Sequence, residues 1–554
     1  MNPARRALLA AAASGCFASC EFRDGAPQPA GALLGTDMAL GHALRDGTLP
    51  APTEERRIGA AIVGAGIGGL SAAWQLARQG ETDVAVFELE DAAGGNARHG
   101  ENAVSPYPLG AHYLPLPASE AVSVRELLAD LGVLAGDPHA PLPRYDERHL
   151  VHAPQERLYK DGLWHDGLLP RAGAGARAIA QIERFDALVA ALKARRDGDG
   201  RRLFASPSLL AGRHADSDAL AATSMDQWMR DNGFDAPLLT WHVDYACRDD
   251  FGARPAQVSA WAGLHYFACR DGVAADADPH NVLTWPEGNG HLVRRLVGWL
   301  RDRGVPPIRT GAPCIRLATA RGGAVLDIYH AAERRSVRYR AARVIWAAPA
   351  FALARVWENA PPAFAALARS IDVSPWLTAN LTLASLPEDA GPAPLAWDNV
   401  LFDSPALGYV VATHQRMRVA PGPTVLTYYW PLADLDPAAG RARLAAAPWQ
   451  AWAAPILDEL ARPHPGLRRQ LQRLDLWRWP HAMPRPVPGF RAAPVRAALA
   501  ALDGPLLFAH SDLSGMPLFE EAHWAGVRAA RRLLGGAGVS APTPAARTGG
   551  RRPR

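Results

Sequence analysis

The chain has 554 residues, of which 49% are apolar and 21% are charged, and its net charge is +4. This length exceeds what one hydrophobic core usually supports, so two intertwined domains of a soluble globular enzyme are expected. The small net charge and the dispersed arginines argue against a nucleic-acid-binding surface. After residue 20 no stretch reaches the ~18 consecutive apolar residues of a membrane span. Membrane contact is therefore expected only through a lipid anchor at the N-terminus.

Residues 1–20 have the features of an export signal. Arg5 and Arg6 give a positively charged start, and Ala7–Ala13 form an apolar segment too short to cross a bilayer. The arginine pair resembles a bacterial twin-arginine signal, which serves proteins that are exported folded with their cofactor inside. Cys16 closes an Ala-Ser-Gly-Cys run that resembles a lipoprotein cleavage site. An exported protein, periplasmic or lipid-anchored, is expected, with a cytoplasmic location as the alternative.

A glycine-rich turn between a strand and a helix organises the chain. Ile58–Val63 is a short apolar run typical of a buried parallel strand, and apolar residues recur with helical spacing from Ile67. A second apolar strand, Val84–Phe87, ends at Glu88. The glycines of the turn, at G-x-G-x-x-G spacing, are Gly64, Gly66 and Gly69. Strand, glycines, helix, strand and acid in this order predict a dinucleotide-binding unit.

Each residue type in this unit has a physical role. Gly64 permits the tight turn, Gly66 leaves room for a pyrophosphate, and Gly69 lets the helix pack on the strand. The start of the helix offers free N–H groups to the phosphates. Glu88 lies where a carboxylate can accept hydrogen bonds from the adenosine ribose. A glycine-rich turn that binds nothing is the alternative, but the surrounding elements favour the nucleotide.

A second glycine run indicates which dinucleotide the unit binds. Gly94-Gly95-Asn96-Ala97-Arg98 follows Glu88 closely, and a Pro-Leu-Gly-Ala-His segment follows at 108–112. These motifs resemble those of the flavin-containing amine oxidase superfamily, which also holds phytoene desaturases and protoporphyrinogen oxidases. In that family an aspartate usually stands where this chain has Pro108. The resemblance implies FAD, bound by a Rossmann-like α/β domain of the GR2 type that is intertwined with a mixed α+β substrate domain.

The resemblance also implies contacts from distant parts of the chain. Cys314 would place its backbone against adenine, and Asp512 would bond the ribityl or pyrophosphate region. The backbone near Ala522, at the positive end of a helix, would favour negative charge on the reduced flavin. The full expected FAD set is Gly64, Ala65, Gly66, Gly68, Gly69, Glu88, Gly94, Gly95, Asn96, Arg98, Gly110, Ala111, Cys314, Asp512 and Ala522.

The predicted domains alternate along the chain. They are an export signal (1–20), a linker (21–56), FAD-binding parts (57–117, 286–350 and 504–536), substrate parts (118–285 and 351–503) and a disordered tail (537–554). In the substrate parts, helical spacing predicts helices at Val122–Leu134, Gln181–Arg195, Met225–Trp241 and Val258–Phe267. Helix Leu292–Arg303, three strands between 313 and 340, and the apolar run 344–349 are expected next. Strands are expected at Leu377–Ala384, Thr424–Trp430 and Gly504–Ala509, and a final helix from Phe519 to Arg532.

Cysteine usage gives no sign of a metal site. Outside the signal the chain has Cys247, Cys269 and Cys314, and none shows C-x-x-C spacing. A Cys247–Cys269 bridge is open in an oxidising compartment, but buried free thiols are favoured. No metal is expected.

The reaction is less defined than the cofactor. The resemblance implies that FAD accepts a hydride equivalent from a small organic substrate and is reoxidised by oxygen or another acceptor. Only one dinucleotide fingerprint is present, which disfavours a second, nicotinamide-binding domain. Many amine oxidases of the family keep a lysine near the flavin, yet residues 374–383 contain none. This puts ordinary amine oxidation in doubt without excluding it.

Three histidines are candidates for acid–base or orienting roles, namely His112, His481 and His510. His112 is preferred because it lies in the segment expected beside the flavin, although a structural role is the alternative for each. Three hypotheses remain open. The chain is an FAD oxidase or dehydrogenase for a small amine or related donor, a desaturase- or isomerase-like flavoenzyme for an apolar substrate, or a non-catalytic FAD-containing or lipid-anchored binding protein.

Overall fold

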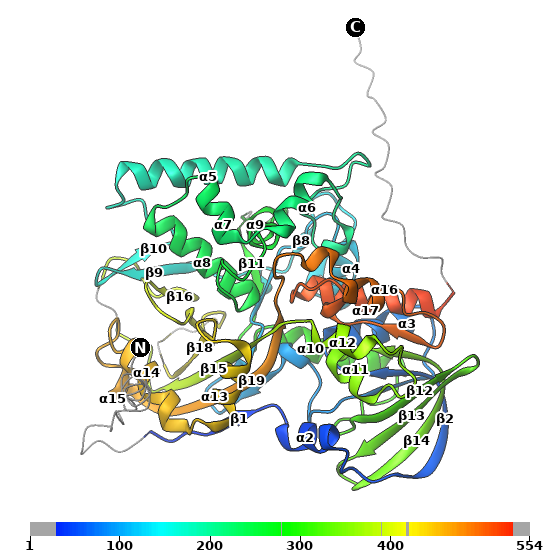
Figure 1. Cartoon of the computed structure of the whole chain (residues 1–554). Coiled ribbons are helices and arrows are strands. Elements are labelled where there is room, and N and C mark those ends of the chain that lie inside the picture. The colour runs from blue at the N-terminus through cyan, green and yellow to red at the C-terminus, as the bar shows by residue number, and fades with distance from the viewer. Residues whose placement is uncertain (1–28, 279, 389–390, 417–419, 421, 536–554) are drawn as a thin grey trace, which may run out of the picture.

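The computed structural model describes residues 29–535 except 279, 389–390, 417–419 and 421. The expected export signal (1–20) and the expected tail (537–554) lie outside the described residues. Two large sheets dominate the molecule, and a layer of helices lies above them in Figure 1.

The first large sheet is the predicted nucleotide-binding unit. Its strands are β12 (Cys314–Ala320), β13 (Gly323–His330), β14 (Arg335–Trp346), β2 (Pro52–Val63) and β3 (Val84–Phe87), in that spatial order, with β20 (Leu506–Phe508) paired to β14. Strands β3, β2, β14 and β20 run parallel, so their carboxyl ends meet at one edge. Ligands bind at this edge in sheets of this kind.

Helices cover both faces of this sheet, and β2 alternates its side chains between the two resulting cores. Ile62 packs with the helices, whereas Ala61 and Val63 point into the core on the other face. The helices of the first face are α3 (Ile67–Arg78), α4 (Val122–Asp130), α10 (Gly290–Asp302) and α17 (Phe519–Leu533). On the other face lie α11 (Ala350–Val356), α12 (Phe364–Arg369) and α16 (Pro494–Ala500). The α/β prediction is confirmed.

The second large sheet forms the base of the substrate domain. Its order is β1 (Leu33–Gly35), β19 (Leu471–Pro484), β15 (Val373–Leu383), β18 (Thr424–Pro431), β17 (Gly408–Val411), β16 (Asp398–Leu401), β9 (Glu156–Lys160) and β10 (Leu163–Asp166). β15 is buried over nearly its whole length between β18 and β19. The predicted strands at 377–384 and 424–430 therefore form the centre of this sheet.

The segment expected as a linker is structured where it is described. Leu33 pairs in parallel with Leu476 of β19, and α2 (Met38–Asp46) follows. Strand β2 also begins at Pro52 rather than Ile58. The polar start of β2 is held by the ladder to β14, where Glu55 pairs with Arg340 at 2.6 Å. Apolar patterning cannot show a strand of this kind, because its stability comes from cross-strand pairs.

The helical layer differs from the prediction at one point. The helix expected over 225–241 is two helices, because Gly233 adopts a positive φ of 65° and Pro237 occupies the first turn of the next helix. The layer consists of α5 (Ala176–Ala194), α6 (Ala215–Ala222), α7 (Met225–Asp231), α8 (Pro237–Phe251) and α9 (Ala260–Ala268). These helices lie at the top of Figure 1.

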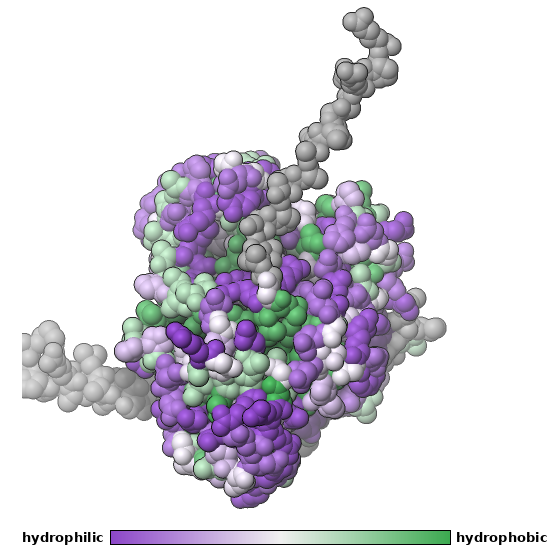
Figure 2. Space-filling view, turned by 90° about the vertical axis from the view of Figure 1, so that its right-hand side faces the viewer, coloured by the Kyte–Doolittle hydropathy of each residue, from purple (hydrophilic) through white to green (hydrophobic). Residues whose placement is uncertain are grey.

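Smaller elements complete the chain. They are three two-stranded sheets, β4 (His99–Glu101) with β5 (Pro106–Pro108), β6 (Tyr113–Pro115) with β11 (Val282–Thr284) and β7 (Leu134–Ala135) with β8 (Arg144–Tyr145), and the helices α13 (Pro437–Ala446), α14 (Trp449–Leu460) and α15 (Leu467–Gln470). Cys247, Cys269 and Cys314 are free and buried. Among the described residues, no helix has the length and apolarity needed to cross a membrane. Seen from the side of the first sheet, most of the surface is hydrophilic, with hydrophobic residues gathered near the centre (Figure 2).

The two ends of the described chain meet where α3 packs on α17. A Cβ on Gly68 would lie 2.0 Å from the carbonyl oxygen of Ala509, just after β20. A Cβ on Gly526 of α17 would lie 2.1 Å from the Gly68 carbonyl oxygen. Contacts this short leave no room for any side chain, so these glycines set the distance between the two helices.

We predict that Gly526→Ala destabilises the protein. The added methyl group would force α3 and α17 apart, which costs about 1–3 kcal/mol in the free energy of unfolding. The matched control is Gly298→Ala in α10, where no atom lies within 4 Å of the new Cβ. This control should stabilise the protein by about 0.5–1 kcal/mol. Equal effects of the two changes in chemical denaturation would contradict the close packing.

Candidate functional site

The glycine turn at the carboxyl end of β2 has the geometry of a phosphate cradle. Gly64 has a φ of 103°, and a Cβ on Gly69 would lie 1.9 Å from the Gly64 carbonyl oxygen. Gly66 is different, because the nearest atom to its Cβ position is the Gly95 Cα at 3.8 Å. Gly66 also begins α3 without a side-chain cap, and the first turn of α3 has no acidic residue. The N–H groups of that turn are thus available to an anion.

Glu88 closes the ribose side of this cradle. It is buried, and its carboxylate accepts hydrogen bonds from the Ala65 and Glu90 backbone N–H groups at 2.6 and 3.0 Å. Burial raises the pKa of Glu88, and the two N–H groups oppose that rise. The carboxylate is therefore fixed beside the glycine turn and keeps lone pairs for hydroxyl donors.

The second glycine run lies directly against the first. The Gly94 N–H donates to the Ala65 carbonyl at 2.8 Å, and the Ala111 N–H donates to the Asn96 carbonyl at 2.8 Å. A Cβ on Gly110 would lie 2.4 Å from that Asn96 oxygen. The structure thus brings the two glycine runs and the 110–111 segment together.

Arg98 is nearly buried beside this run, with 7% of its side chain exposed. It pairs with Glu90 at 2.9 Å and with Asp91, and its guanidinium lies 5.0 Å from the Trp477 ring. Its Nε atom is buried and has no hydrogen-bond partner among the described residues. A buried N–H donor without a protein partner at this position can donate a hydrogen bond to an acceptor atom of the cofactor.

Cys314 lies on the segment that runs beside Glu88. The Ala312 N–H donates to the Glu88 carbonyl at 2.7 Å, which places the start of β12 next to the expected adenosine. Burial raises the pKa of the Cys314 thiol to about 12. Any contact of Cys314 with the cofactor would therefore involve its backbone or a neutral thiol rather than a nucleophilic thiolate.

Residues near the C-terminal end of the described chain also lie at the carboxyl edge of the first sheet. Asp512 is buried, accepts the Ala350 N–H at 2.8 Å and lies 3.2 Å from the His510 Nδ1. Burial opposes ionisation of Asp512, but His510 and this N–H hold its pKa below the usual value. The Ala522 carbonyl lies near Gly68, but the Ala522 N–H already donates to the Leu518 carbonyl.

The free N–H groups of α17 therefore belong to its first residues, before Ala522. Two buried acids, Glu520 and Glu521, occupy that first turn. Burial raises the pKa of Glu520 to about 7.

His112 lies in an aromatic cluster between the two sheets. Its ring stacks on Tyr429 at a centroid distance of 4.4 Å and lies 5.6 Å from the Trp397 ring. Tyr429 Oη donates to the Gly110 carbonyl at 3.0 Å, so the stack is tied to the expected flavin segment. Burial lowers the pKa of His112 to about 3, and the imidazole is therefore neutral in the physiological range.

An acidic recess adjoins His112, and we use this term for Glu156, Asp249 and Asp398. Asp398 of β16 lies in register beside Glu156 of β9. The Tyr113 hydroxyl, next to His112, donates to Asp249 at 3.1 Å, and the Tyr245 hydroxyl contacts Asp398 at 3.4 Å. None of the three acids forms an ion pair within the described part of the chain.

Electrostatics in the acidic recess favour bound cations. Burial raises the pKa of Glu156 and Asp249 and raises that of Asp398 well above its usual value. The Glu156 and Asp249 carboxylates add to the rise at Asp398, whereas the Arg270 guanidinium opposes the rise at Glu156 and Asp249. The Arg270 guanidinium faces the group, but it pairs with Asp250 at 3.0 Å and donates to the Tyr113 hydroxyl at 2.8 Å. All three acids keep part of their surface accessible.

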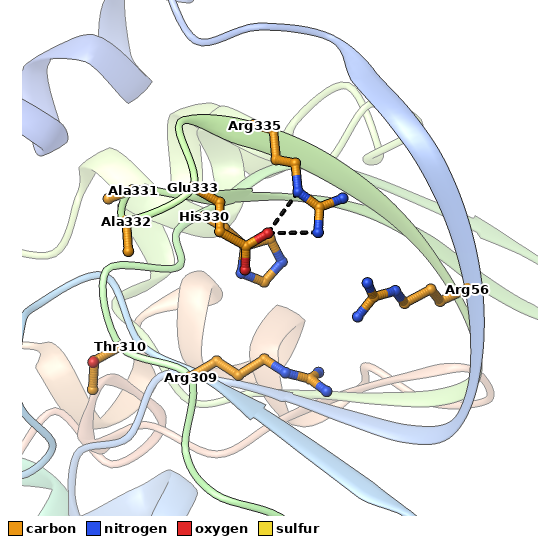
Figure 3. Close-up of a pocket in the computed structure, with 8 residues that line it drawn as sticks. All are labelled: Arg56, Arg309, Thr310, His330, Ala331, Ala332, Glu333 and Arg335. Atoms are coloured by element: carbon orange, nitrogen blue, oxygen red, sulfur yellow. Dashed lines mark hydrogen bonds and ion pairs between the residues drawn. The ribbon is translucent and has the colours of Figure 1, made fainter.

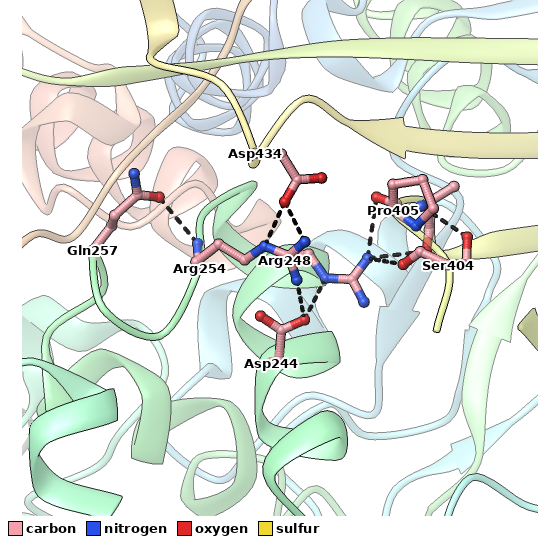
Figure 4. Close-up of polar contacts among 8 residues, drawn as sticks. Asp244, Arg248, Arg254, Gln257, Ser404, Pro405 and Asp434 are labelled. Carbon is pink, nitrogen blue, oxygen red and sulfur yellow. Dashed lines mark hydrogen bonds and ion pairs between the residues drawn. The ribbon is translucent and has the colours of Figure 1, made fainter. Parts of the chain in front are cut away.

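A second arginine network fixes α8 against the substrate sheet, as Figure 4 shows. Arg248 pairs with Asp244 at 2.8 Å and donates to the carbonyl groups of Ser404, Pro405 and Ala406 between β16 and β17. Arg254 bonds the same Asp244 and Asp434. Since Asp249 follows Arg248 and Asp398 begins β16, this network positions two sides of the acidic recess.

The sequence indicated the nucleotide residues but not the acidic recess. Glu156, Asp249 and Asp398 belong to three distant elements, and no motif surrounds them. The other histidine candidates lie elsewhere: His510 contacts Asp512, and His481 lies 4.9 Å from the Phe351 ring, with its pKa lowered to about 4 by burial. Among the described residues, no group of three or more His, Cys, Asp or Glu side chains could hold a metal.

Comparison with known protein families shows the family of the chain. The family of flavin containing amine oxidoreductases matches residues 67–534, which is most of the chain. The chain belongs to this family. No curated protein sequence matches it.

Solved structures of the amine oxidoreductase fold resemble the chain over most of its length. Putrescine oxidase bound to putrescine is 16% identical, with a TM-score of 0.61 over 87% of this chain and 100% of that one. Cyclohexylamine oxidase from Brevibacterium oxydans is 17% identical, with a TM-score of 0.60 over 86% and 99%. A fatty acid isomerase from P. acnes that produces CLA is 15% identical, with a TM-score of 0.58 over 85% and 97%. At these identities the likeness shows the fold.

The residues present fit the FAD that the family implies. The open space at Gly66, the uncapped start of α3 and the orphaned Arg98 Nε suit a pyrophosphate, and Glu88 suits a ribose. The chain is an FAD-dependent oxidoreductase that takes a small-molecule substrate and an electron acceptor such as oxygen.

We predict that Gly66→Val weakens FAD binding without unfolding the protein. The side chain would occupy the space of the pyrophosphate, yet its Cβ meets no atom closer than 3.8 Å in the protein itself. The flavin-to-protein absorbance ratio after purification should fall, whereas circular dichroism should be unchanged. Gly41→Val in α2, where the Cβ position is also open, is the control and should keep its FAD. Full FAD content in Gly66→Val would refute this phosphate site.

We predict that His112→Ala slows anaerobic reduction of the bound FAD by substrate about tenfold, because a neutral ring that orients the substrate is lost. FAD content should be unchanged. Since the pKa of His112 is about 3, the pH profile of the remaining rate should keep its wild-type shape between about pH 6 and 9. An unchanged rate would remove His112 from the site, and a lost pH step would show that its imidazole titrates.

Proposed function

We propose that the chain oxidises an amine, which enters the acidic recess as an ammonium ion and passes its electrons to FAD. The observation that carries this proposal is the acidic recess next to His112. Three partly accessible carboxylates face one another there, and the described residues supply none of them with an ion pair. Buried carboxylates are retained at a cost, and a bound cation offsets it.

The pKa values in the recess support a cationic ligand. Burial raises the pKa of Asp398, and repulsion from Glu156 and Asp249 adds to that rise. A bound ammonium would lower these pKa values and restore the ionised forms. The lack of a partner is clearest for Glu156, since no hydrogen bond to its carboxylate is present among the described residues.

The roles of the residues follow from this arrangement. FAD, when bound, supplies the two-electron acceptor. An ammonium held in the recess can lose a proton to an Oδ atom of the ionised Asp249 or Asp398 carboxylate. The stacked rings of His112 and the buried Tyr429 would limit the positions of the free amine.

An apolar substrate is the second candidate function. The fold likeness to a fatty acid isomerase favours it, and residues 374–383 of β15 contain no lysine of the kind many amine oxidases keep. Against it, an alkyl chain in the recess would bury the three carboxylates without partners, at several kcal/mol. The amine is therefore the function that the geometry supports best.

We predict that Asp398→Asn raises the KM for amine substrates at least about tenfold, because one charge facing the ammonium is lost. FAD content and the hydrogen bond from Tyr245 should survive this isosteric change. Asp403→Asn is the matched control, since Asp403 is exposed in the same strand region and its φ of 57° suits asparagine. An unchanged KM in Asp398→Asn would contradict the recess as the ammonium site.

Anaerobic bleaching of the flavin distinguishes the classes of substrate. Mono- and diamines should bleach the bound FAD, whereas unsaturated fatty acids should not. Bleaching by none of a broad set of amines would refute the proposal. Turnover of fatty acids alone would favour the second candidate.

A further inference from the structure

A basic pocket lies on the nucleotide-binding domain, outside the two glycine runs. Its volume is about 230 Å³, and it is shown in Figure 3. We call it the arginine pocket. The side chains used below are Arg56, Arg309, Thr310, His330, Glu333 and Arg335.

The arginine pocket and the phosphate cradle occupy opposite ends of β2. Arg56 pairs in register with Tyr339, whereas Val63, which precedes the glycine turn, pairs with Trp346. Arg309 itself pairs beside Phe87, and its carbonyl accepts the Glu88 N–H at 2.8 Å, so the pocket adjoins the expected ribose end of the cofactor. The residues that line it are outside the two glycine runs, which distinguishes the pocket from the pyrophosphate cradle.

Arg309 is the centre of the pocket. Its guanidinium lies 5.3 Å from the Phe87 ring and 5.5 Å from the Tyr339 ring, and these buried rings fix its position. Its Nη1 atom is buried and has no hydrogen-bond partner, and Arg309 forms no ion pair within the described residues. A buried charged donor without an acceptor is costly, so the pocket is incomplete as it stands.

The other charged groups leave a net positive pocket. Glu54, next to the pocket, pairs with both Arg56 and Arg335, and Glu333 pairs with Arg335. Three arginines thus stand against two carboxylates, and the uncompensated charge is that of Arg309. Figure 3 shows Arg56 and Arg309 directed toward the same space, which Glu333 enters from the side of Arg335.

The neutral groups of the pocket are compatible with an anion. His330 Nε2 contacts the Tyr339 hydroxyl at 3.1 Å. Burial lowers the pKa of His330, so this ring adds no charge near neutrality. Thr310 also lines the pocket.

We propose that the arginine pocket binds a phosphate group, either free phosphate or the phosphate of a small metabolite. Guanidinium groups bind such oxyanions through paired, charge-assisted hydrogen bonds. The volume is below the ~300 Å³ at which pockets for drug-sized ligands begin, which suits a small anion. A phosphate oxygen at Nη1 would supply the acceptor that Arg309 lacks.

Isothermal titration of the FAD-saturated enzyme tests this proposal, with inorganic phosphate and glycerol 3-phosphate as probes at constant ionic strength. Arg309→Leu should weaken binding at least about tenfold, since a charged hydrogen bond is lost. The matched control is Arg303→Leu, which removes another arginine stacked on a ring, 3.5 Å from Trp299 on the opposite face of the sheet. This control should bind as the wild type does.

A second variant keeps the test valid if Arg309→Leu fails to fold. Arg56→Ser changes a side chain that is 44% exposed, so it should fold normally and bind both probes severalfold more weakly. Tighter binding of glycerol 3-phosphate than of phosphate would identify a metabolite site, and equal binding would identify a site for free phosphate. No saturable binding by the wild-type enzyme, or equal binding by Arg56→Ser and wild type, would overturn the proposal.

Discussion

The close contact between α3 and α17 is the constraint on which the nucleotide site depends. Gly68 and Gly526 allow the two helices to approach within backbone contact, and Ala509 after β20 is part of the same junction. The contact joins residues from both ends of the described chain at the carboxyl edge of one parallel sheet. Glu88, the two glycine runs and Asp512 converge on that edge because each follows the end of a strand or precedes a helix there.

The substrate sheet supplies a different kind of chemistry. Its strands β9 and β16 carry Glu156 and Asp398, and the Arg248 network holds α8 so that Asp249 completes the group. The aromatic stack of His112 on Tyr429 lies between the acidic recess and the nucleotide edge. In the proposed function, the two sheets therefore bind different groups, FAD through N–H donors at one sheet and an ammonium through carboxylates at the other.

Much of the nucleotide site could be predicted from the sequence, because its residues are close in the chain and each has a local role. The strand, turn, helix and acid from 58 to 88 form as expected, and the resemblance placed β14 and β20 beside them. The contacts of the individual residues with FAD stay predictions, as does the export signal at 1–20, which lies outside the described residues.

The rest depends on contacts that no local pattern encodes. Strand β1 has only three residues and exists because β19 offers a free edge. The acidic recess needs three acids that are brought together from distant elements. The arginine pocket needs the register of β2 on β14, which begins in a polar segment that hydrophobic periodicity does not detect.

Titration of the deflavinated protein with FAD is the most direct test of the central claim that both chain ends form one FAD site. The absorbance and fluorescence of the flavin should change until one FAD per chain is bound and then remain constant. A protein that takes up no FAD, or that binds further equivalents with equal affinity, would contradict this account.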